Sequence, residues 1–241
     1  YFPHKSIPML PRELSENLCS LKLKADRLCF VCEILFDENF SVIKESFYEA
    51  IINVHKNYSY DKVELFLDKQ SSNDTEARLQ ECFNMTKRIK KERLKNGVDF
   101  SSSETKLIID KNGFIKKTQT SFSVASHSLV EECMLLANKA AANILGDEGI
   151  FRVHPPADIS KVHDVAKNIL ALGIDATMGK DVISSIKNIQ KQTPENLRSF
   201  IDVLLIKSQS RASYQKNQEA HFGLGFKAYT HFTSPIRRYC E

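Results

Sequence analysis

The residues that could most directly do chemistry lie near the end of the chain. A serine hydroxyl is a good helix cap and proline fits the first helical position, so a helix is predicted to begin at Ser234-Pro235. Arg237 and Arg238 would lie in its first turn, at the positive end of the helix dipole. Cations are favourable there if an anion is bound, because free N–H groups and an arginine fork together form a phosphate site. The alternative is two arginines on a solvated helix.

Carboxylates and cysteines are the candidates for binding a metal. Hydrolysis of a phosphodiester by bound metals requires several carboxylates around two cations about 4 Å apart, and the sequence has no run of the Asp-x-Asp-Asp type. Cys29 and Cys32 form a Cys-x-x-Cys, but within a strand this spacing sends the two side chains to opposite faces. The six cysteines are scattered, which is typical of free thiols in a reducing compartment. No residue of this sequence is therefore predicted to bind a metal.

Length and composition are those of an ordinary globular protein. The chain has 241 residues, of which 42% are hydrophobic and 27% charged, so it can bury a substantial core. Its net charge of +4 permits an acidic partner without requiring one. No apolar run approaches the roughly 20 residues that span a bilayer, and the start has no signal-peptide pattern. We therefore expect a cytoplasmic protein with no membrane partner.

Two hairpins are predicted from apolar runs and turn residues. The near-continuous apolar run at 26–36 is typical of a strand buried on both faces, and a second strand region follows at 41–55. Asn112-Gly113 is a strong hairpin signal between 105–109 and 114–118. Segments with no regular pattern are 1–25, an irregular entry, and 151–156, an extended linker.

Six helices are predicted from apolar residues at helical spacing, with Gly and Pro at their ends. Their ranges are 62–67, 75–96, 126–145, 159–172, 180–192 and 195–212. The second half of the helix at 75–96 is rich in cations: Lys87, Arg88, Lys90, Lys91, Arg93 and Lys95. They could follow an RNA backbone, but we favour a solvated face at the negative end of the helix dipole. Hairpins followed by helices predict an α+β fold in a single domain.

Three blocks spread along the chain resemble one known family. They are Ile-Pro-Met-Leu-Pro-Arg-Glu-Leu at 7–14, Val-Glu-Glu-Cys-Met-Leu-Leu-Ala-Asn at 130–138 and Tyr-Thr-His-Phe-Thr-Ser-Pro-Ile-Arg-Arg-Tyr at 229–239. Together they are similar to the RNase II/RNase R family of 3′-to-5′ exoribonucleases, and most like its bacterial RNase R-type members. The resemblance implies that 1–241 is the central and C-terminal part of an RNB-type catalytic domain. It also implies a sheet core walled by helices around a narrow channel, with flanking RNA-binding domains outside the chain.

The resemblance assigns three aromatic residues to RNA binding. Tyr1 would stack on a base near the 3′ end, Tyr60 would orient the terminal nucleotide, and Phe100 would clamp the bases. Stacking suits an enzyme that must hold any sequence, because every base has a π-face. The alternative is that these rings fill the core or lie on the surface.

The resemblance also assigns three charged residues. Glu131 would contact the 3′-terminal ribose, Arg237 would act as the catalytic arginine on the phosphates at the scissile end, and Arg238 would support neighbouring phosphates or the structure. A carboxylate on ribose hydroxyls favours RNA over DNA; the alternative for Glu131 is a favourable interaction with the helix dipole. The sequence departs from the family pattern at Cys240, a place for proline or glycine, and at Glu241, a place for aspartate.

The function implied by the resemblance is hydrolysis of single-stranded RNA from its 3′ end to nucleoside 5′-monophosphates, with Mg²⁺ as cofactor. The family's metal-binding aspartates precede the block at 7–14, so we expect the chain to be an internal piece of a longer protein and inactive by itself. The expected partners are single-stranded RNA and an RNA helicase or other RNA-decay proteins. The alternative is a non-catalytic RNA-binding or scaffolding module.

Overall fold

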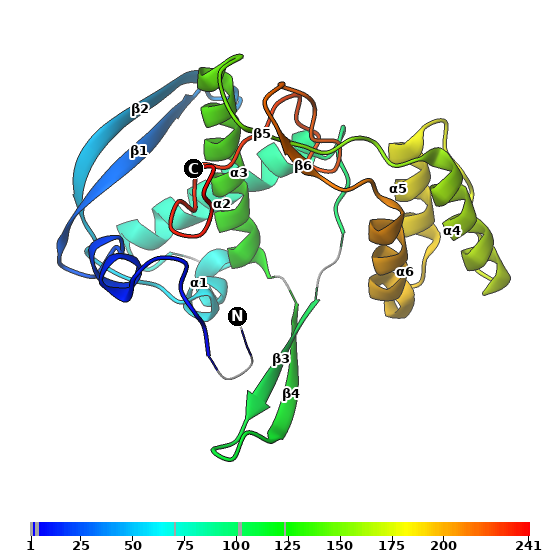
Figure 1. The fold of residues 1–241 in the computed structure, drawn as a ribbon, viewed down its shortest axis with the longest axis horizontal. Coiled ribbons are helices and arrows are strands. Elements are labelled where there is room, and N and C mark those ends of the chain that lie inside the picture. Colours follow the sequence, from blue (N-terminus) through cyan, green and yellow to red (C-terminus); the bar gives the residue numbers. More distant parts are fainter. Residues whose placement is uncertain (1, 3–4, 70, 101–102, 123) are drawn as a thin grey trace.

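The computed structural model describes residues 2, 5–69, 71–100, 103–122 and 124–241. Figure 1 shows the long helix α3 (Ala125–Leu145) near the middle of the molecule, between the β1–β2 hairpin and a group of three helices, α4 to α6. The segment that ends the chain runs alongside α3. This placement makes α3 the element against which the other parts are arranged.

Strands in the described part of the chain pair into three separate two-stranded antiparallel sheets. The pairs are β1 (Asp26–Phe36) with β2 (Val42–Asn53), β3 (Ser103–Ile109) with β4 (Ile115–Phe122), and β5 (Phe151–Val153) with β6 (Ser213–Gln215). The first two pairs confirm the predicted hairpins, and Gly113 takes a positive φ of 87° in the second turn.

The remaining helices agree closely with the predicted ranges, and several begin at a residue whose side chain caps them. They are α1 (Tyr60–Leu67), α2 (Asp74–Arg93), α4 (Ile159–Ala171), α5 (Val182–Gln192) and α6 (Glu195–Ser208). Ser59 caps α1 and Asp181 caps α5, because each side chain accepts a hydrogen bond from the backbone of the first turn. None of the helices in the described residues has both the length and the apolar character needed to cross a membrane.

The largest group of buried apolar side chains lies between α4, α5 and α6. Ile169, Ile189 and Leu205, one from each helix, are completely buried. Each of these helices therefore turns its apolar stripe toward the other two. Helices and strands are mixed as predicted, which confirms the α+β class, but this buried group is formed by helices and not by a sheet.

Three predictions about local structure are wrong. The strand at 26–36 is not buried on both faces: Leu28 is 82% exposed, because a two-stranded sheet is covered on one side only. Residues 151–156 are not merely a linker, since Phe151–Val153 forms β5. The entry at 1–25 contains a short π-helical turn, η1 (Glu13–Leu18).

Two glycines allow the end of α2 to touch the loop before the last segment. A Cβ on Gly225 would lie 2.7 Å from the Arg93 carbonyl oxygen and 2.9 Å from the Gly97 nitrogen. Gly225 also has a φ of 73°, a conformation that other residues adopt only with strain. The Val98 N–H donates to the Gly223 carbonyl at 3.1 Å. The two backbones are therefore in direct contact. Gly225 is required both for this close approach and for its positive φ.

Replacing Gly225 with alanine should destabilise the chain by about 2–4 kcal/mol, since left-handed strain of about 1–2 kcal/mol adds to a steric clash. The matched control is Gly173→Ala, because Gly173 has a φ of 77° but open space around its Cα. It should cost only the strain, about 1–2 kcal/mol. Denaturant unfolding of both variants measures the difference, and equal losses would contradict the close approach.

Candidate functional site

One stripe of α3 carries three residues that could form a site. His127, Glu131 and Asn138 are separated by four and seven positions, so they lie on the same face of the helix. His127 stacks on Tyr60, Glu131 faces solvent, and Asn138 is buried. The stripe is the place where residues distant in the sequence come together.

Tyr60 lies at the start of this stripe. Its ring stacks on His127, with ring centroids 4.0 Å apart and an interplanar angle of 15°. The two helix starts are also joined by a hydrogen bond, since the Ser126 N–H donates to a Glu64 carboxylate oxygen at 2.9 Å. Tyr60 is 44% exposed, so one face of its ring is supported while part of its surface faces solvent.

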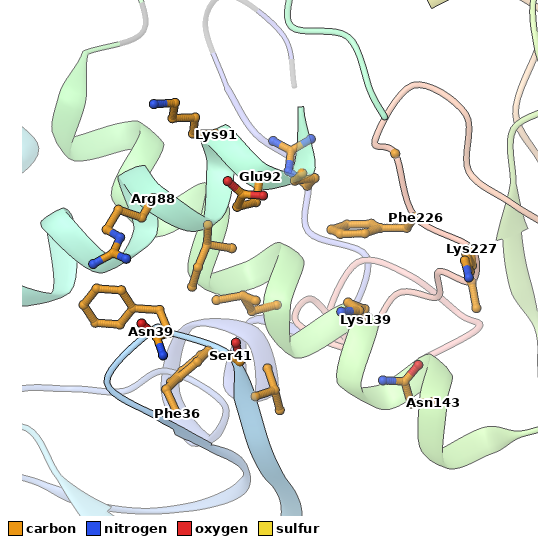
Figure 2. Close-up of a pocket in the computed structure, with 17 residues that line it drawn as sticks. Phe36, Asn39, Ser41, Arg88, Lys91, Glu92, Lys139, Asn143, Phe226 and Lys227 are labelled. Atoms are coloured by element: carbon orange, nitrogen blue, oxygen red, sulfur yellow. The ribbon is translucent and has the colours of Figure 1, made fainter. Parts of the chain in front are cut away.

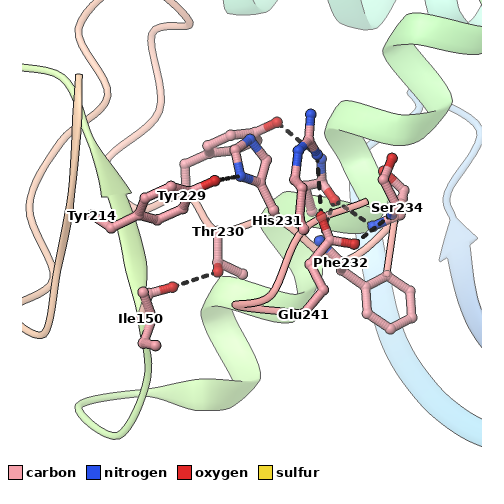
Figure 3. A network of polar contacts seen from close by, with 11 residues as sticks. Ile150, Tyr214, Tyr229, Thr230, His231, Phe232, Ser234 and Glu241 are labelled. Atoms are coloured by element: carbon pink, nitrogen blue, oxygen red, sulfur yellow. Dashed lines mark hydrogen bonds and ion pairs between the residues drawn. The ribbon is translucent and has the colours of Figure 1, made fainter. Parts of the chain in front are cut away.

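Asn138 holds the segment that follows Gly225. Its Nδ2 donates to the Tyr229 hydroxyl at 2.9 Å, and its Oδ1 accepts from the Phe232 and Thr233 N–H groups at 2.8 and 3.2 Å. The Thr230 hydroxyl donates to the Ile150 carbonyl at 2.6 Å (Figure 3). Asn138 is only 3% exposed, so water does not compete with it as the hydrogen-bond partner of these groups.

Aromatic contacts attach the same segment to the β1–β2 hairpin. The Phe232 ring centroid lies 5.8 Å from that of Phe30 and 5.1 Å from that of Phe47, both edge-on. This edge-to-face geometry is the favourable arrangement for such pairs. Phe232 therefore connects the segment after Gly225 to the β1–β2 hairpin.

A buried ion pair joins α2 to α3 beside this site. The Arg93 guanidinium donates to both Glu132 carboxylate oxygens, with Nε 3.1 Å from Oε2, and Nη1 donates to the Leu224 carbonyl at 3.1 Å. The two side chains are 6% and 1% exposed. The sequence-based interpretation placed Arg93 on a solvated basic face with the other cations at 87–95. For Arg93 this interpretation is wrong, because its side chain is buried.

Two histidines in the last part of the chain, His221 and His231, are neutral at pH 7. Burial, reinforced by the nearby charges of Arg238, Arg152 and Arg237, lowers the pKa of His231 to about 4. Burial also lowers the pKa of His221 to about 4. In the unfolded chain these histidines bind protons more readily than in the folded one. Their contribution to the stability of the fold is therefore complete above about pH 6.5, and it is lost as the pH falls toward 4.

The predicted helix at Pro235 is absent from the described residues, where 235–240 forms consecutive turns. The Arg237 N–H donates to the Ser234 carbonyl at 3.1 Å and the Glu241 N–H to the Arg238 carbonyl at 3.3 Å, and these bonds across three positions are those of turns. The Ser234 N–H instead donates to the Glu241 carboxylate, which also pairs with Arg238 at 3.1 Å. Arg237 is exposed, and no ion pair or hydrogen bond of its side chain occurs within the described part of the chain.

The predicted site residues are thus brought together only in part. Tyr60 and Glu131 lie along the stripe of α3, and Glu131 is exposed. Phe100 is half-buried against the α4–α6 cluster and belongs to the core side of the molecule. Tyr1 lies outside the described residues. Its role and those of the other predicted residues stay predictions.

A cavity of about 860 Å³ lies between the β1–β2 turn, α2, α3 and the segment 225–228. Figure 2 shows Arg88, Lys91, Lys139 and Lys227 around it, opposite Phe36 and other residues of the hairpin. None of these four cations forms an ion pair with another described residue. The cavity therefore combines four cations that lack an ion-pair partner among the described residues with a lining that is partly apolar and partly polar, Glu92 included.

Metal ligands are not clustered in the described residues. No group of three or more His, Cys, Asp or Glu side chains there could hold a metal ion. Cys29 and Cys32 are free thiols, and Cys29 Sγ lies 3.6 Å from the Ala50 carbonyl oxygen. The described residues therefore do not fit a magnesium site.

Sequence reasoning alone does not identify His127, Asn138, Glu132 or Arg93 as parts of this arrangement. A helical projection of 126–145 would have placed His127, Glu131 and Asn138 on one face. Nothing in the sequence indicates that Arg93 is the single buried member of a cationic run.

Comparisons with known proteins agree on one family. The RNB domain profile matches residues 1–240. Ribonuclease R of Helicobacter pylori is 37% identical over the full chain, which spans 38% of that protein's length. The apo structure of Mycoplasma genitalium RNase R has a TM-score of 0.86 at 30% identity, covering 98% of this chain and 39% of that one. The same enzyme in complex with ribose-methylated single-stranded RNA has a TM-score of 0.85 at 29% identity, covering 98% of this chain and 39% of that one.

Replacing Asn138 with alanine should leave two backbone N–H groups and a tyrosine hydroxyl unpaired, at a cost of about 2–4 kcal/mol. Hydrogen exchange of the Phe232 and Thr233 amides should accelerate more than that of the α5 amides. Asn143→Ala is the control on the same helix, because Asn143 is exposed and, among the described residues, its side chain donates only to Glu45. If both variants exchange alike, Asn138 does not hold the segment.

Glu132 and Glu131 provide a matched pair of glutamates. Glu132→Gln should destabilise the chain by about 3–5 kcal/mol, because it leaves the Arg93 charge buried without a counterion. Glu131→Gln should change stability by less than about 0.5 kcal/mol, since this side chain is exposed. The midpoints of urea unfolding test the contrast, and a reversed order would disprove the assignment of the buried partner.

Proposed function

Because the chain belongs to the RNB domain family, we propose that it forms part of a 3′-to-5′ hydrolytic exoribonuclease that degrades single-stranded RNA to nucleoside 5′-monophosphates. The chain spans 38% of the length of its Helicobacter pylori relative, so the activity is proposed for the whole protein. In this proposal 1–241 is the central and C-terminal part of the catalytic domain, flanked by RNA-binding domains. The isolated chain would be inactive.

The observation that carries this proposal is the stripe on α3. It brings an exposed tyrosine, Tyr60, and an exposed carboxylate, Glu131, to one helix face. Asn138 on the same face fixes the segment that leads to Arg237. Stacking, ribose recognition and phosphate contact are the three functions that a sequence-independent exonuclease must provide at a 3′ end.

Each residue has a role suited to its surroundings. The Tyr60 ring, backed by His127, would hold the terminal base or orient its nucleotide. Glu131 would accept hydrogen bonds from the ribose hydroxyls. Arg237, exposed and unpaired within the described residues, would contact the phosphates at the scissile end and stabilise developing negative charge.

Three further residues, Arg238, Phe100 and Tyr1, were predicted to bind RNA. Arg238 pairs with Glu241, which supports a role in shaping the turns around Arg237 more than direct phosphate binding. Phe100 packs against the α4–α6 cluster, so it would have to contact the bases through the part of its ring that stays exposed. Tyr1 is proposed to stack on a base from the entry segment.

The cofactor and setting complete the proposal. Mg²⁺ would be bound by ligands outside the described residues, because the described residues hold no cluster of three or more metal ligands. A cytoplasmic location is proposed, with single-stranded RNA as substrate and an RNA helicase or other RNA-decay proteins as partners. The Mycoplasma genitalium enzyme in complex with single-stranded RNA supports RNA as the ligand.

The alternative is a non-catalytic RNA-binding or scaffolding module. It would need the same cations and aromatic rings but no metal site. The unpaired cations around the 860 Å³ cavity are compatible with either function, since they would attract an RNA backbone in both. The family relationship favours the enzyme.

Arg237→Ala should lower the rate of RNA shortening by about 10²–10³-fold, because it removes charge stabilisation at the scissile phosphate. Stability should change by less than about 0.5 kcal/mol. The assay follows 5′-labelled single-stranded RNA with Mg²⁺, using protein expressed from the complete gene.

Arg78→Ala is the matched loss of one positive charge, since Arg78 is 77% exposed and pairs only with Asp74. It should leave the rate unchanged. A descending ladder in wild type that persists unaltered in Arg237→Ala would disprove the role of this arginine. RNA that is bound but never shortened by wild type would favour the binding module.

A further inference from the structure

Two free cysteines face each other across the contact between α2 and α3. Cys82 Sγ lies 3.9 Å from Cys133 Sγ, while the residues are 51 positions apart in the sequence. Both thiols are half-buried and neither is in a disulfide. Of the described cysteines, these two are the pair for which a direct sulfur contact is found.

We propose that Cys82 and Cys133 form a redox-sensitive dithiol site, in which oxidation by hydrogen peroxide closes an intramolecular disulfide that cross-links α2 to α3. A disulfide requires an S–S distance of about 2.05 Å, so the sulfurs must approach by a little under 2 Å. Rotation about the side-chain torsions of both residues supplies movement of this size without unfolding either helix.

The pair lies away from the stripe proposed to contact RNA. Cys133 is two positions after Glu131, which places the two side chains about 200° apart around α3. Glu132, between them, is engaged with Arg93 in the same contact between α2 and α3. The cross-link would therefore fix the packing of the two helices from inside, and the inference does not depend on the proposed exonuclease activity.

The chemistry divides into two balanced steps. The Cys82 thiolate attacks one peroxide oxygen, which breaks the O–O bond and gives a sulfenic acid and one water after proton transfer. The Cys133 thiol then attacks that sulfur, forms the S–S bond and releases a second water. Two thiols lose two electrons and two protons in total, and hydrogen peroxide is reduced to two waters.

Either sulfur could donate in the contact between the two thiols, and their surroundings favour Cys82 as the attacking thiol. A hydrogen bond from the Cys133 thiol stabilises the Cys82 thiolate and lowers the pKa of Cys82 to about 7, although burial and the neighbouring Glu81 oppose this. The pKa of Cys133 is raised, mainly because its proton is held by Cys82 and because the thiol is buried, with a smaller effect of Glu132. Cys82 is therefore the better nucleophile near neutral pH and Cys133 the resolving thiol.

The first test treats the reduced protein, expressed from the complete gene, with limiting hydrogen peroxide, alkylates the remaining thiols and maps peptides without reduction. We expect an intramolecular Cys82–Cys133 linkage, with both thiols lost together and both recovered on treatment with dithiothreitol. Linkage through Cys19, or free alkylation of Cys82 and Cys133 while other thiols oxidise, would overturn the proposal.

Single variants separate the two roles. Cys133→Ser should accumulate a sulfenic acid on Cys82 that dimedone traps, because the resolving thiol is gone. Cys82→Ser should leave Cys133 free for alkylation. Trapping at Cys133 but not at Cys82 would overturn the assignment of the nucleophile.

The contact between the thiols has its own readout. Cys133→Ala removes the hydrogen-bond donor, so the pKa of Cys82 should rise toward its ordinary value of 9.0. At pH 7 the reaction of Cys82 with a disulfide reagent should slow by about sixfold, since the lost thiolate fraction is partly offset by greater nucleophilicity. Cys133→Ser keeps a donor and should react faster than Cys133→Ala. Equal rates in the two variants would contradict the contact, and the peptide map of the wild-type chain tests the linkage without any variant.

Discussion

The buried ion pair between Arg93 and Glu132 organises the region around α3. It lies where α2, α3 and the loop at Leu224 meet, and Arg93, the last residue of α2, donates to both of the other two parts. Such a pair is costly to desolvate and is retained only where its hydrogen bonds are satisfied. Here the guanidinium satisfies the carboxylate and a backbone carbonyl together, so the position of the loop is tied to the packing of the two helices.

The loop beyond Arg93 transmits this order to the last part of the chain. Gly225 packs against the backbone at Arg93 and Gly97, and Asn138 then fixes the backbone at Phe232 and Thr233. Arg237, four residues after Thr233, is exposed while the residues that support it are buried or paired. Different sides of α3 thus perform different tasks: one packs against α2 through Glu132 and Cys133, and another presents Glu131.

Much of the secondary structure can be predicted from the sequence because its signals are local. Ser59 and Asp181 are capping residues, and Asn112-Gly113 permits the tight turn of a hairpin. β5 cannot be predicted in this way, because its partner β6 is distant in the sequence and three residues carry too little pattern. The helix at Pro235 fails for the opposite reason: its local signal is strong, but the backbone there closes turns, with hydrogen bonds from the Arg237 N–H to the Ser234 carbonyl and from the Glu241 N–H to the Arg238 carbonyl.

The candidate site is less predictable than the fold. Family resemblance selects Glu131 and Arg237, but it does not show that Tyr60 is backed by His127 or that Asn138 anchors the final segment. Those contacts join residues tens of positions apart, and side-chain partners at that range are set by tertiary packing. The apolar run of β1 is misleading for the same reason, since burial depends on what covers the second face.

The most direct test of this account is photocrosslinking to RNA that carries 4-thiouridine as its 3′-terminal nucleotide. The protein expressed from the complete gene is crosslinked, digested and mapped by mass spectrometry. The account predicts crosslinks in the peptides that contain Tyr60 and residues 229–241, on the two sides of the α3 stripe. Crosslinks confined to α4, α5 and α6, or to the hairpin side of the cavity beside Arg88, would contradict it.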